Sequence, residues 1–121
     1  MEETPLSRTS RAWREVDGKA LAHNARLLQD LLAPGCRLMA VVKAEAYGHG
    51  AVWAARTLEA QGVDAFAVAC LSEGIALRRA GISGVILVLG WTPPEQAPLL
   101  AAHGLTQAVA DTAHGLALSA Q

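Results

Sequence analysis

Four short apolar runs, separated by segments with helical character, limit the possible folds of this chain more than any other feature. The runs cover residues 38–42, 65–70, 85–89 and, more weakly, 106–110, and they begin about 20 to 27 residues apart. Continuous apolar runs are typical of strands that are buried on both faces, as in a parallel sheet covered by helices. The alternation therefore predicts an α/β fold built of serial β-α units with right-handed crossovers.

Helix signals fill every gap between these runs. Asp17 can cap a helix that continues to about Leu32 and ends at Pro34 and Gly35. Further helices are predicted over residues 51–60, over 73–80 with Ser72 as cap, over 92–104 with Thr92 as cap, and over 111–118 with Asp111 as cap. Periodicity alone does not separate an open doubly wound sheet from a barrel, so both arrangements stay open at this point.

The beginning of the chain is predicted to lie outside the serial units. Residues 1–10 are polar and contain Pro5, so we expect a flexible tail there. Residues 12–16 alternate apolar and polar side chains, which predicts a half-buried strand before the first helix. The folded part is thus expected over residues 11–121.

Composition narrows the class of protein. The 121 residues suffice for about one small domain, and 52% hydrophobic with 17% charged residues is typical of a globular chain. The net charge of −1 gives no reason to expect a nucleic acid as partner. We see no signal peptide and no apolar stretch of roughly 20 residues, which predicts a cytoplasmic protein with no membrane span in this segment. Cys36 and Cys70 lack metal-binding spacing and are predicted to be buried, reduced thiols.

Lys43 follows the first apolar run directly and precedes a turn framed by Gly48 and Gly50. A lysine at that place would carry its amine out of the end of a buried strand into a largely apolar site. Such surroundings favour the neutral amine, which can form a Schiff base with an aldehyde such as pyridoxal phosphate. The alternative is an ordinary solvated lysine, whose stem lies on apolar surface while its charge stays in water.

The residues around this lysine form a recognisable motif, because positions 41–50 read V-V-K-A-E-A-Y-G-H-G. This segment resembles the cofactor-lysine motif of the alanine racemases, a family of fold-type III pyridoxal-phosphate enzymes, which reads V-V-K-A-N-A-Y-G-H-G. Nine of the ten positions agree, and Glu45 replaces the usual asparagine. Residues 13–17, 67–74, 77–82 and 86–90 resemble further family segments in the family's order. The resemblance favours an enzyme site over a solvated lysine.

The resemblance also implies a fold. Alanine racemases have a (β/α)8 barrel followed by a β-rich domain, so the barrel is favoured over the open sheet. About four β-α units are present, which would make residues 11–121 the amino-terminal part of a truncated barrel domain. The rest of the barrel and the β-rich domain would then lie outside this sequence. A partial barrel exposes two sheet edges and an apolar interior, so we expect the isolated chain to dimerise, aggregate or be marginally stable.

Individual residues receive roles from the same resemblance. Lys43 would hold pyridoxal phosphate covalently and, once freed by substrate, would act as the base that takes the proton from D-alanine. The Tyr47 hydroxyl would bond to the cofactor phosphate. Val41 and Leu89 would point into the barrel mouth near the cofactor, although ordinary core packing explains these two residues equally well. No metal site is expected.

Other conspicuous residues are given structural roles. We expect His49 to orient the turn after Lys43, and we expect the Glu45 carboxylate either to act on the lysine or to face solvent. Trp53 and Trp91 are predicted to pack at the barrel exterior and mouth. Surface positions are predicted for the remaining histidines, which are His23, His103 and His114.

The function that the resemblance implies is interconversion of L-alanine and D-alanine for cell-wall peptidoglycan precursors. In the family the opposing base is a tyrosine from the β-rich domain of the partner subunit, so the full enzyme would be a homodimer and the isolated chain inactive. A serine or broad-specificity racemase of the same family, including the kind fused to a membrane domain, is an open alternative. A second alternative is a non-catalytic pyridoxal-phosphate-binding barrel, although such proteins lack the K-A-x-A-Y-G-H-G continuation. A third alternative is a structural remnant that binds no cofactor.

Overall fold

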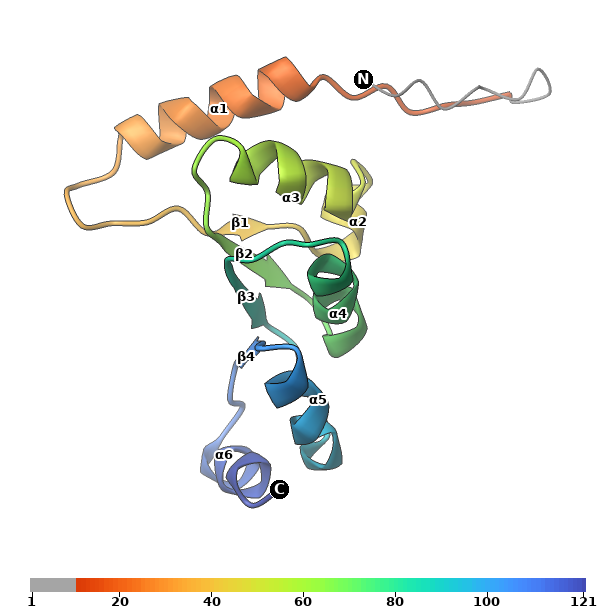
Figure 1. The fold of residues 1–121 in the computed structure, drawn as a ribbon, viewed down its shortest axis with the longest axis vertical. Coiled ribbons are helices and arrows are strands. Elements are labelled where there is room, and N and C mark those ends of the chain that lie inside the picture. The colour runs from red at the N-terminus through yellow and green to blue at the C-terminus, as the bar shows by residue number, and fades with distance from the viewer. Residues whose placement is uncertain (1–10) are drawn as a thin grey trace.

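The computed structural model describes residues 11–121 and contains one parallel four-stranded sheet in the order β1-β2-β3-β4 (Figure 1). The strands are β1 Ala40–Val41, β2 Ala65–Val68, β3 Val85–Val88 and β4 Thr106–Gln107. Each strand lies within one of the four predicted apolar runs, so the predicted serial α/β fold is confirmed. The tail predicted over residues 1–10 lies outside the described residues.

Helices precede, connect and follow the four strands. They are α1 Gly18–Asp30, α2 Lys43–Tyr47, α3 Ala51–Glu59, α4 Leu71–Arg79, the 3-10 helix η1 Pro94–Gln96, α5 Ala97–Ala102 and α6 Thr112–Ser119. Asp17 caps α1 as predicted, because its carboxylate accepts the backbone N–H groups of Lys19 and Ala20 at 2.9 and 3.1 Å. Asp111 caps α6 by accepting the N–H of His114 at 2.7 Å. None of the helices in residues 11–121 has the length and apolar character needed to cross a membrane.

The helices α3, α4 and α5 lie along one side of the sheet, and the strand order shows no reversal (Figure 1). A doubly wound sheet would carry helices on both faces and a switch point in its strand order. Consecutive parallel strands with helices outside are instead the wall of a (β/α)8 barrel. The fold is therefore a partial barrel, as the family resemblance implies.

The core lies between the sheet and these helices, where Phe66, Ile86 and Val88 are fully buried. The prediction that every strand is buried on both faces is wrong for β1, β3 and β4, and Thr106 of β4 is exposed. Val41 and Val85 are exposed, because within residues 11–121 no second layer covers that face of the sheet. β2 is buried throughout, since its open-face residues are small alanines flanked by strands on both sides.

Three local predictions are wrong for identifiable reasons. Residues 12–16 form no strand, because a strand needs a pairing partner and none of the four strands in residues 11–121 pairs with this segment. Ser72 does not cap α4, because the helix begins at Leu71, two residues earlier than predicted, with Cys70 at the cap position. Thr92 does not cap a helix either, because its hydroxyl donates to the Gln107 side chain and the helical part begins at Pro94.

The predicted burial of the two cysteines is wrong, because both thiols are exposed. Cys36 lies in the loop before β1, where the chain crosses the surface between α1 and the sheet. Cys70 lies between the end of β2 and the start of α4, at the edge where the strands end. Proximity to a strand in sequence therefore does not bury either thiol.

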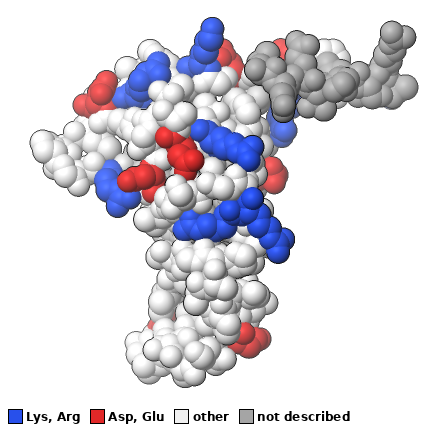
Figure 2. All heavy atoms as spheres, viewed as in Figure 1, with Lys and Arg blue, Asp and Glu red and all other residues white. Residues whose placement is uncertain are grey.

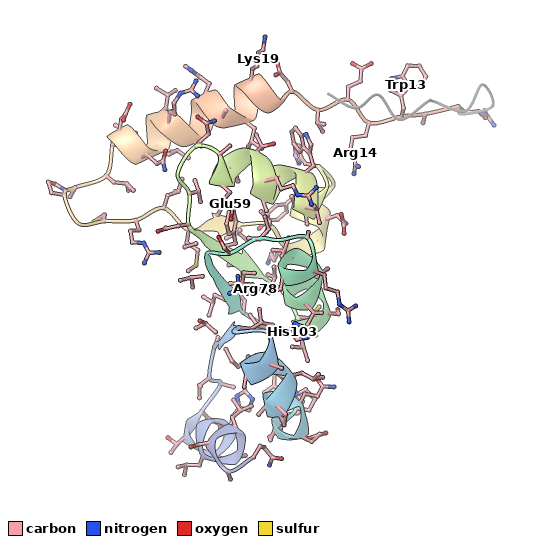
Figure 3. The ribbon with its side chains drawn as sticks, in the orientation of Figure 1. Trp13, Arg14, Lys19, Glu59, Arg78 and His103 are labelled. Carbon is pink, nitrogen blue, oxygen red and sulfur yellow. The ribbon has the colours of Figure 1, made fainter. Side chains whose placement is uncertain are left out.

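The amino-terminal edge of the sheet is held by Arg78 of α4 (Figure 3). Its guanidinium donates to the carbonyl oxygens of Ile82 and Gly84 at 2.8 and 2.7 Å, and to those of His103 and Gly104 at 2.8 and 2.9 Å. These carbonyls lie in the loops that lead into β3 and β4. One half-buried side chain thus joins two β-α units. The candidate site lies at the opposite edge of the sheet.

Candidate active site

Lys43 lies at the carboxyl end of β1, on the edge where (β/α)8 barrels carry their active sites. The preceding residue, Val42, is buried and donates its backbone N–H to the Ala67 carbonyl of β2 at 2.9 Å. This bond ties the backbone beside the lysine to the sheet. The Lys43 side chain is half-buried, and among residues 11–121 its amine has no hydrogen-bond or ion-pair partner. The amine is therefore available to a ligand.

A left-handed turn follows the lysine. Four consecutive non-glycine residues have φ between 50 and 56°, namely Ala44, Glu45, Ala46 and Tyr47. The left-handed conformation costs an L-residue about 1–2 kcal/mol, so four in a row require support from neighbouring elements. Gly48 and Gly50 continue with φ of 94 and 97°, which glycine adopts readily. Strain concentrated beside a lysine at this edge of a barrel points to a functional site.

Two charged side chains hold the left-handed turn from outside. Glu73 of α4 accepts the Ala44 N–H at 2.9 Å, directly after Lys43. Arg14, in the segment before α1, donates to the Gly48 carbonyl at the end of the turn (Figure 3). The turn is thus fastened at its first residue and just beyond its last.

The side chains of Glu45 and His49 both form hydrogen bonds with nearby backbone groups. The Glu45 carboxylate accepts the Ala51 N–H at 3.2 Å and so caps the start of α3. Its side chain is exposed, and it is directed to a helix end rather than to the lysine amine. The His49 imidazole donates from Nδ1 to the Ala46 carbonyl at 2.8 Å, a contact through which this histidine can orient the turn as predicted.

Tyr47 is the last residue of α2, so Lys43 and Tyr47 lie at the two ends of one short helical element. The tyrosine is 63% exposed, and its hydroxyl has no partner among residues 11–121. An aromatic ring held out of the core offers both apolar area and a hydrogen-bonding hydroxyl to a ligand. The structure places both predicted residues at one edge of the sheet, and their roles toward a cofactor stay predictions.

Val41 and Leu89 lie on the open face of the sheet. They are 40% and 44% exposed, whereas their chain neighbours Val42 and Val88 are buried beneath the helices. Val41 comes two residues before Lys43, and Leu89 directly follows β3. Core packing within residues 11–121 therefore does not account for these two side chains, and their contact with a cofactor stays a prediction.

A buried polar network beside β3 and β4 is a feature that sequence reasoning misses. His114 is only 5% exposed, accepts the Ala110 N–H on Nδ1 at 3.1 Å and donates from Nε2 to the Thr92 carbonyl at 2.8 Å. The surface position predicted for His114 is therefore wrong. Trp91 stacks on the His114 ring with 5.5 Å between centroids, and the Thr92 hydroxyl donates to the Gln107 side chain. The available sequence signal is the distance from the Asp111 cap, which places the histidine in the first turn of α6.

A cavity of about 320 Å³ opens at the same edge of the sheet. It lies between the loops that follow β2 and β3 and is lined by residues 70–72 and 91–93 together with Ile75 and Gln96. Lys43 and Tyr47 do not line it. No group of three or more metal-ligating side chains occurs in the described residues 11–121. Lys43 and Tyr47 thus lie at this edge of the sheet but outside the cavity, whose lining includes the exposed Cys70 thiol.

Comparison with models of known protein families identifies the family to which the chain belongs. The model for the alanine racemase N-terminal domain matches residues 16–121. The chain belongs to this family. The match covers all four strands and the helices between them, so the resemblance stated from the lysine motif and its flanking segments is confirmed.

Relatives in the alanine racemase family are much longer than this chain. A serine/alanine racemase of Enterococcus gallinarum is 43% identical over 118 residues, which is 98% of this chain and 16% of the relative. An alanine racemase of Clostridium difficile 630 superposes with a TM-score of 0.86 and 36% identity, covering 94% of this chain and 30% of that one. The structure of alanine racemase from Bacillus anthracis with bound L-Ala-P gives a TM-score of 0.76 and 36% identity, and the match covers 83% of this chain and 27% of that one. The chain spans less than a third of each relative.

Proposed function

We propose that this chain supplies the cofactor-binding lysine of a pyridoxal-phosphate-dependent alanine racemase, and that Lys43 is that lysine. The observation that carries the proposal is the place of Lys43, half-buried at the carboxyl end of the first strand and followed by a strained left-handed turn. Membership of the alanine racemase family supports the class of reaction. Because the relatives are more than three times as long, the activity of a complete enzyme is part of the proposal.

The residues at this edge fit pyridoxal phosphate. Lys43 offers an amine without a partner in residues 11–121, and an aldehyde needs such an amine to form a Schiff base. Tyr47 offers an exposed hydroxyl that can donate to a phosphate oxygen. Val41 and Leu89 offer an apolar wall that can lie against an aromatic ring and keep water from it.

The reaction assigns two tasks to Lys43. Pyridoxal phosphate, when bound, draws electrons from the α-carbon of an attached amino acid and makes its α-hydrogen acidic. Lys43 would hold the cofactor through its Nζ, and the same amine, once freed by the substrate, would accept the α-proton of D-alanine. The resemblance assigns the opposite face to a tyrosine of the partner subunit, outside this sequence. The complete site thus requires a homodimer, and the isolated chain would bind cofactor without efficient turnover.

Alanine is the favoured substrate, and serine is the second candidate because a relative covering 98% of this chain is a serine/alanine racemase. The open face beside Lys43 presents Val41 and Leu89, which offer no hydrogen-bond partner to a serine hydroxyl. A complete barrel would enclose this face, and a hydroxyl buried there without a partner would cost about 1–3 kcal/mol. The D-alanine formed would serve cell-wall peptidoglycan precursors.

Reductive trapping tests the assignment of Lys43. The chain contains two lysines, Lys19 and Lys43, so few amines compete for an aldehyde. Incubation of the 121-residue chain with pyridoxal phosphate, reduction with borohydride and peptide mass spectrometry should place the pyridoxyl group on Lys43. Lys43→Ala should abolish this label, whereas Lys19→Ala, which removes an exposed lysine of α1, should leave it unchanged. A label on Lys19 alone, or no label at all, would overturn the proposal.

Competition by amino acids separates the two substrates. An amino acid that binds at the site takes the cofactor aldehyde from Lys43 and so lowers the amount of trapped label. In the full-length protein, where a complete barrel would enclose this face, L-alanine should act at a concentration about tenfold below that of L-serine, because of the unpaired hydroxyl. β-Alanine serves as the control for reaction in free solution. Equal potency of L-alanine and L-serine would favour the broad-specificity racemase instead.

A further inference from the structure

Glu73 of α4 connects the turn after Lys43 with the end of β2. Its Oε2 accepts the Ala44 N–H at 2.9 Å, and its Oε1 accepts the Ala69 N–H at 3.2 Å. The Cys70 thiol also donates to Oε1, at 3.5 Å. One half-buried carboxylate therefore spans two neighbouring β-α units at the carboxyl edge of the sheet.

Ala44 is the residue through which this carboxylate reaches the lysine. It follows Lys43 directly and is the first residue of the left-handed turn, with φ of 50° and ψ of 52°. Its carbonyl accepts from Gly48 inside the turn at 3.2 Å, while its N–H has its acceptor outside, on α4. Lys43 thus lies between two fixed peptide groups, since the Val42 N–H is bonded to β2 and the Ala44 N–H is bonded to Glu73.

We propose that Glu73 is a positioning residue for Lys43. By holding Ala44, it keeps the left-handed turn closed and fixes the direction in which the lysine amine leaves the backbone. The inference rests on the cofactor-binding role proposed above for Lys43 and deepens it. Glu73 lies outside the lysine motif of residues 41–50 and reaches that motif only in the folded structure.

The chemistry of the contact calls for two acceptor oxygens. A carboxylate accepts both N–H groups at once, and a charged acceptor makes stronger hydrogen bonds than a neutral one. A glutamine at position 73 would keep one acceptor oxygen and turn an NH2 group toward the second N–H donor. It would preserve the volume of the side chain and lose about half of the contact. An alanine would leave both N–H groups without this acceptor.

Glu59 of α3 provides a matched control (Figure 3). Its Oε2 accepts the Ser83 N–H at 3.2 Å, so this carboxylate also joins two β-α units through a backbone amide. Glu59 is half-buried, as Glu73 is. Its contact lies in the loop before β3, at the amino-terminal edge of the sheet and therefore at the end opposite to Lys43. A general loss of stability would follow from either substitution, whereas displacement of Lys43 would follow only from a change at Glu73.

The experiment compares the 121-residue chain with Glu73→Ala, Glu73→Gln and Glu59→Ala by two measurements. Amide hydrogen exchange over residues 43–50 reports on the turn without any cofactor. The pyridoxal phosphate concentration that gives half-maximal trapping on Lys43 reports on the amine. Glu73→Ala should raise the exchange rate and this concentration by about tenfold each, as expected for loss of a charged hydrogen bond. Glu73→Gln should raise each by about threefold, and Glu59→Ala should leave both within about twofold.

Every outcome bears on the role of Glu73. Unchanged exchange in Glu73→Ala, or faster exchange with unchanged trapping, overturns the positioning role. Equal effects of Glu59→Ala and Glu73→Ala on trapping also overturn it, since they would reduce Glu73 to general stability. If Lys43 is not labelled in the wild-type chain, both the proposed function and this inference are wrong. If Lys43 is labelled in the wild type and exchange and trapping are unchanged in Glu73→Ala, only this inference is wrong. If Glu73→Ala does not fold, the isosteric Glu73→Gln carries the same comparison.

Discussion

Left-handed backbone at four consecutive non-glycine residues distinguishes the turn after Lys43 from an ordinary connection between a strand and a helix. Three elements contribute to holding it. Glu73 of α4 accepts the Ala44 N–H, and Arg14 of the segment before α1 donates to the Gly48 carbonyl. At the start of α3, the Ala51 N–H donates to the Glu45 carboxylate of the turn. Strain that is compensated in this way keeps the backbone beside the lysine in one conformation.

Replacement of Ala44 by glycine should raise the free energy of unfolding by about 0.5–1 kcal/mol. Glycine enters the left-handed region without the cost of about 1–2 kcal/mol that alanine carries there. The greater freedom of glycine in the unfolded chain offsets about 0.5–1 kcal/mol of this gain. The Ala44 side chain is exposed, so little packing is lost. Denaturation by urea, followed by circular dichroism, measures the change.

Ala76→Gly is the control for this substitution. Ala76 is exposed in the middle of the right-handed helix α4, where glycine should lower the free energy of unfolding by about 1 kcal/mol. The two substitutions remove the same methyl group and should therefore act with opposite signs. A loss of stability in Ala44→Gly as large as that in Ala76→Gly would mean that the left-handed conformation is not a source of strain.

The lysine motif predicts where Lys43 and Tyr47 lie, but it does not predict the hand of the backbone between them. Alanine and glutamate are good formers of right-handed helix, and only the glycines at 48 and 50 signal positive φ. The conformation of the turn depends on Glu73, 29 residues from Ala44 in the sequence. No local pattern contains such a contact, so this part of the site emerges only from the folded chain.

At the scale of elements, apolar periodicity predicts the strands and most helices, while several polar contacts at their ends escape it. Asp17 and Asp111 are correctly predicted as caps, because a helix cap acts on N–H groups within three residues. Thr92 satisfies the same local pattern, yet its hydroxyl bonds to Gln107, fifteen residues away. The parallel pairing of β3 with β4 brings that side chain close, and a buried polar group takes the partner that the fold provides.

His114→Ala should lower the free energy of unfolding by about 2–3 kcal/mol. The substitution removes the donor to the Thr92 carbonyl and the acceptor of the Ala110 N–H. A buried polar group left without a partner costs about 1–3 kcal/mol, and the stacking on Trp91 is lost as well. Chemical denaturation measures the effect.

His23→Ala is the control for His114→Ala, because both histidines lie on helices but His23 is exposed on α1. Its removal should change the free energy of unfolding by less than about 0.5 kcal/mol. Similar losses in the two variants would contradict the structural role that we give to His114. Apolar helix patterning treats both residues alike, since it does not show which histidine meets a buried carbonyl.

At the scale of the whole molecule, the chain forms a barrel wall with one uncovered side. Val85 and Leu89 are exposed on that side, and within residues 11–121 the outer edges of β1 and β4 have no pairing strand. Charged side chains gather over α1, α3 and α4 in the view of Figure 2 and are sparse over α5 and α6. From residue 80 onward, the only Asp, Glu, Lys or Arg residues are Glu95 and Asp111. Little charge therefore opposes association through this part of the chain.

The isolated 121-residue chain should consequently self-associate at micromolar concentrations. Sedimentation velocity over a range of concentrations should show a mean mass that rises above that of the monomer. Val85→Lys places a charge on the open face and should shift the chain toward monomer, because burial of an unpaired charge is costly. Leu31→Lys changes a leucine that is 82% exposed just beyond α1, away from the sheet, and should leave association unchanged. A monomer at every concentration, or dissociation by Leu31→Lys alone, would exclude the open face of the sheet as the contact surface.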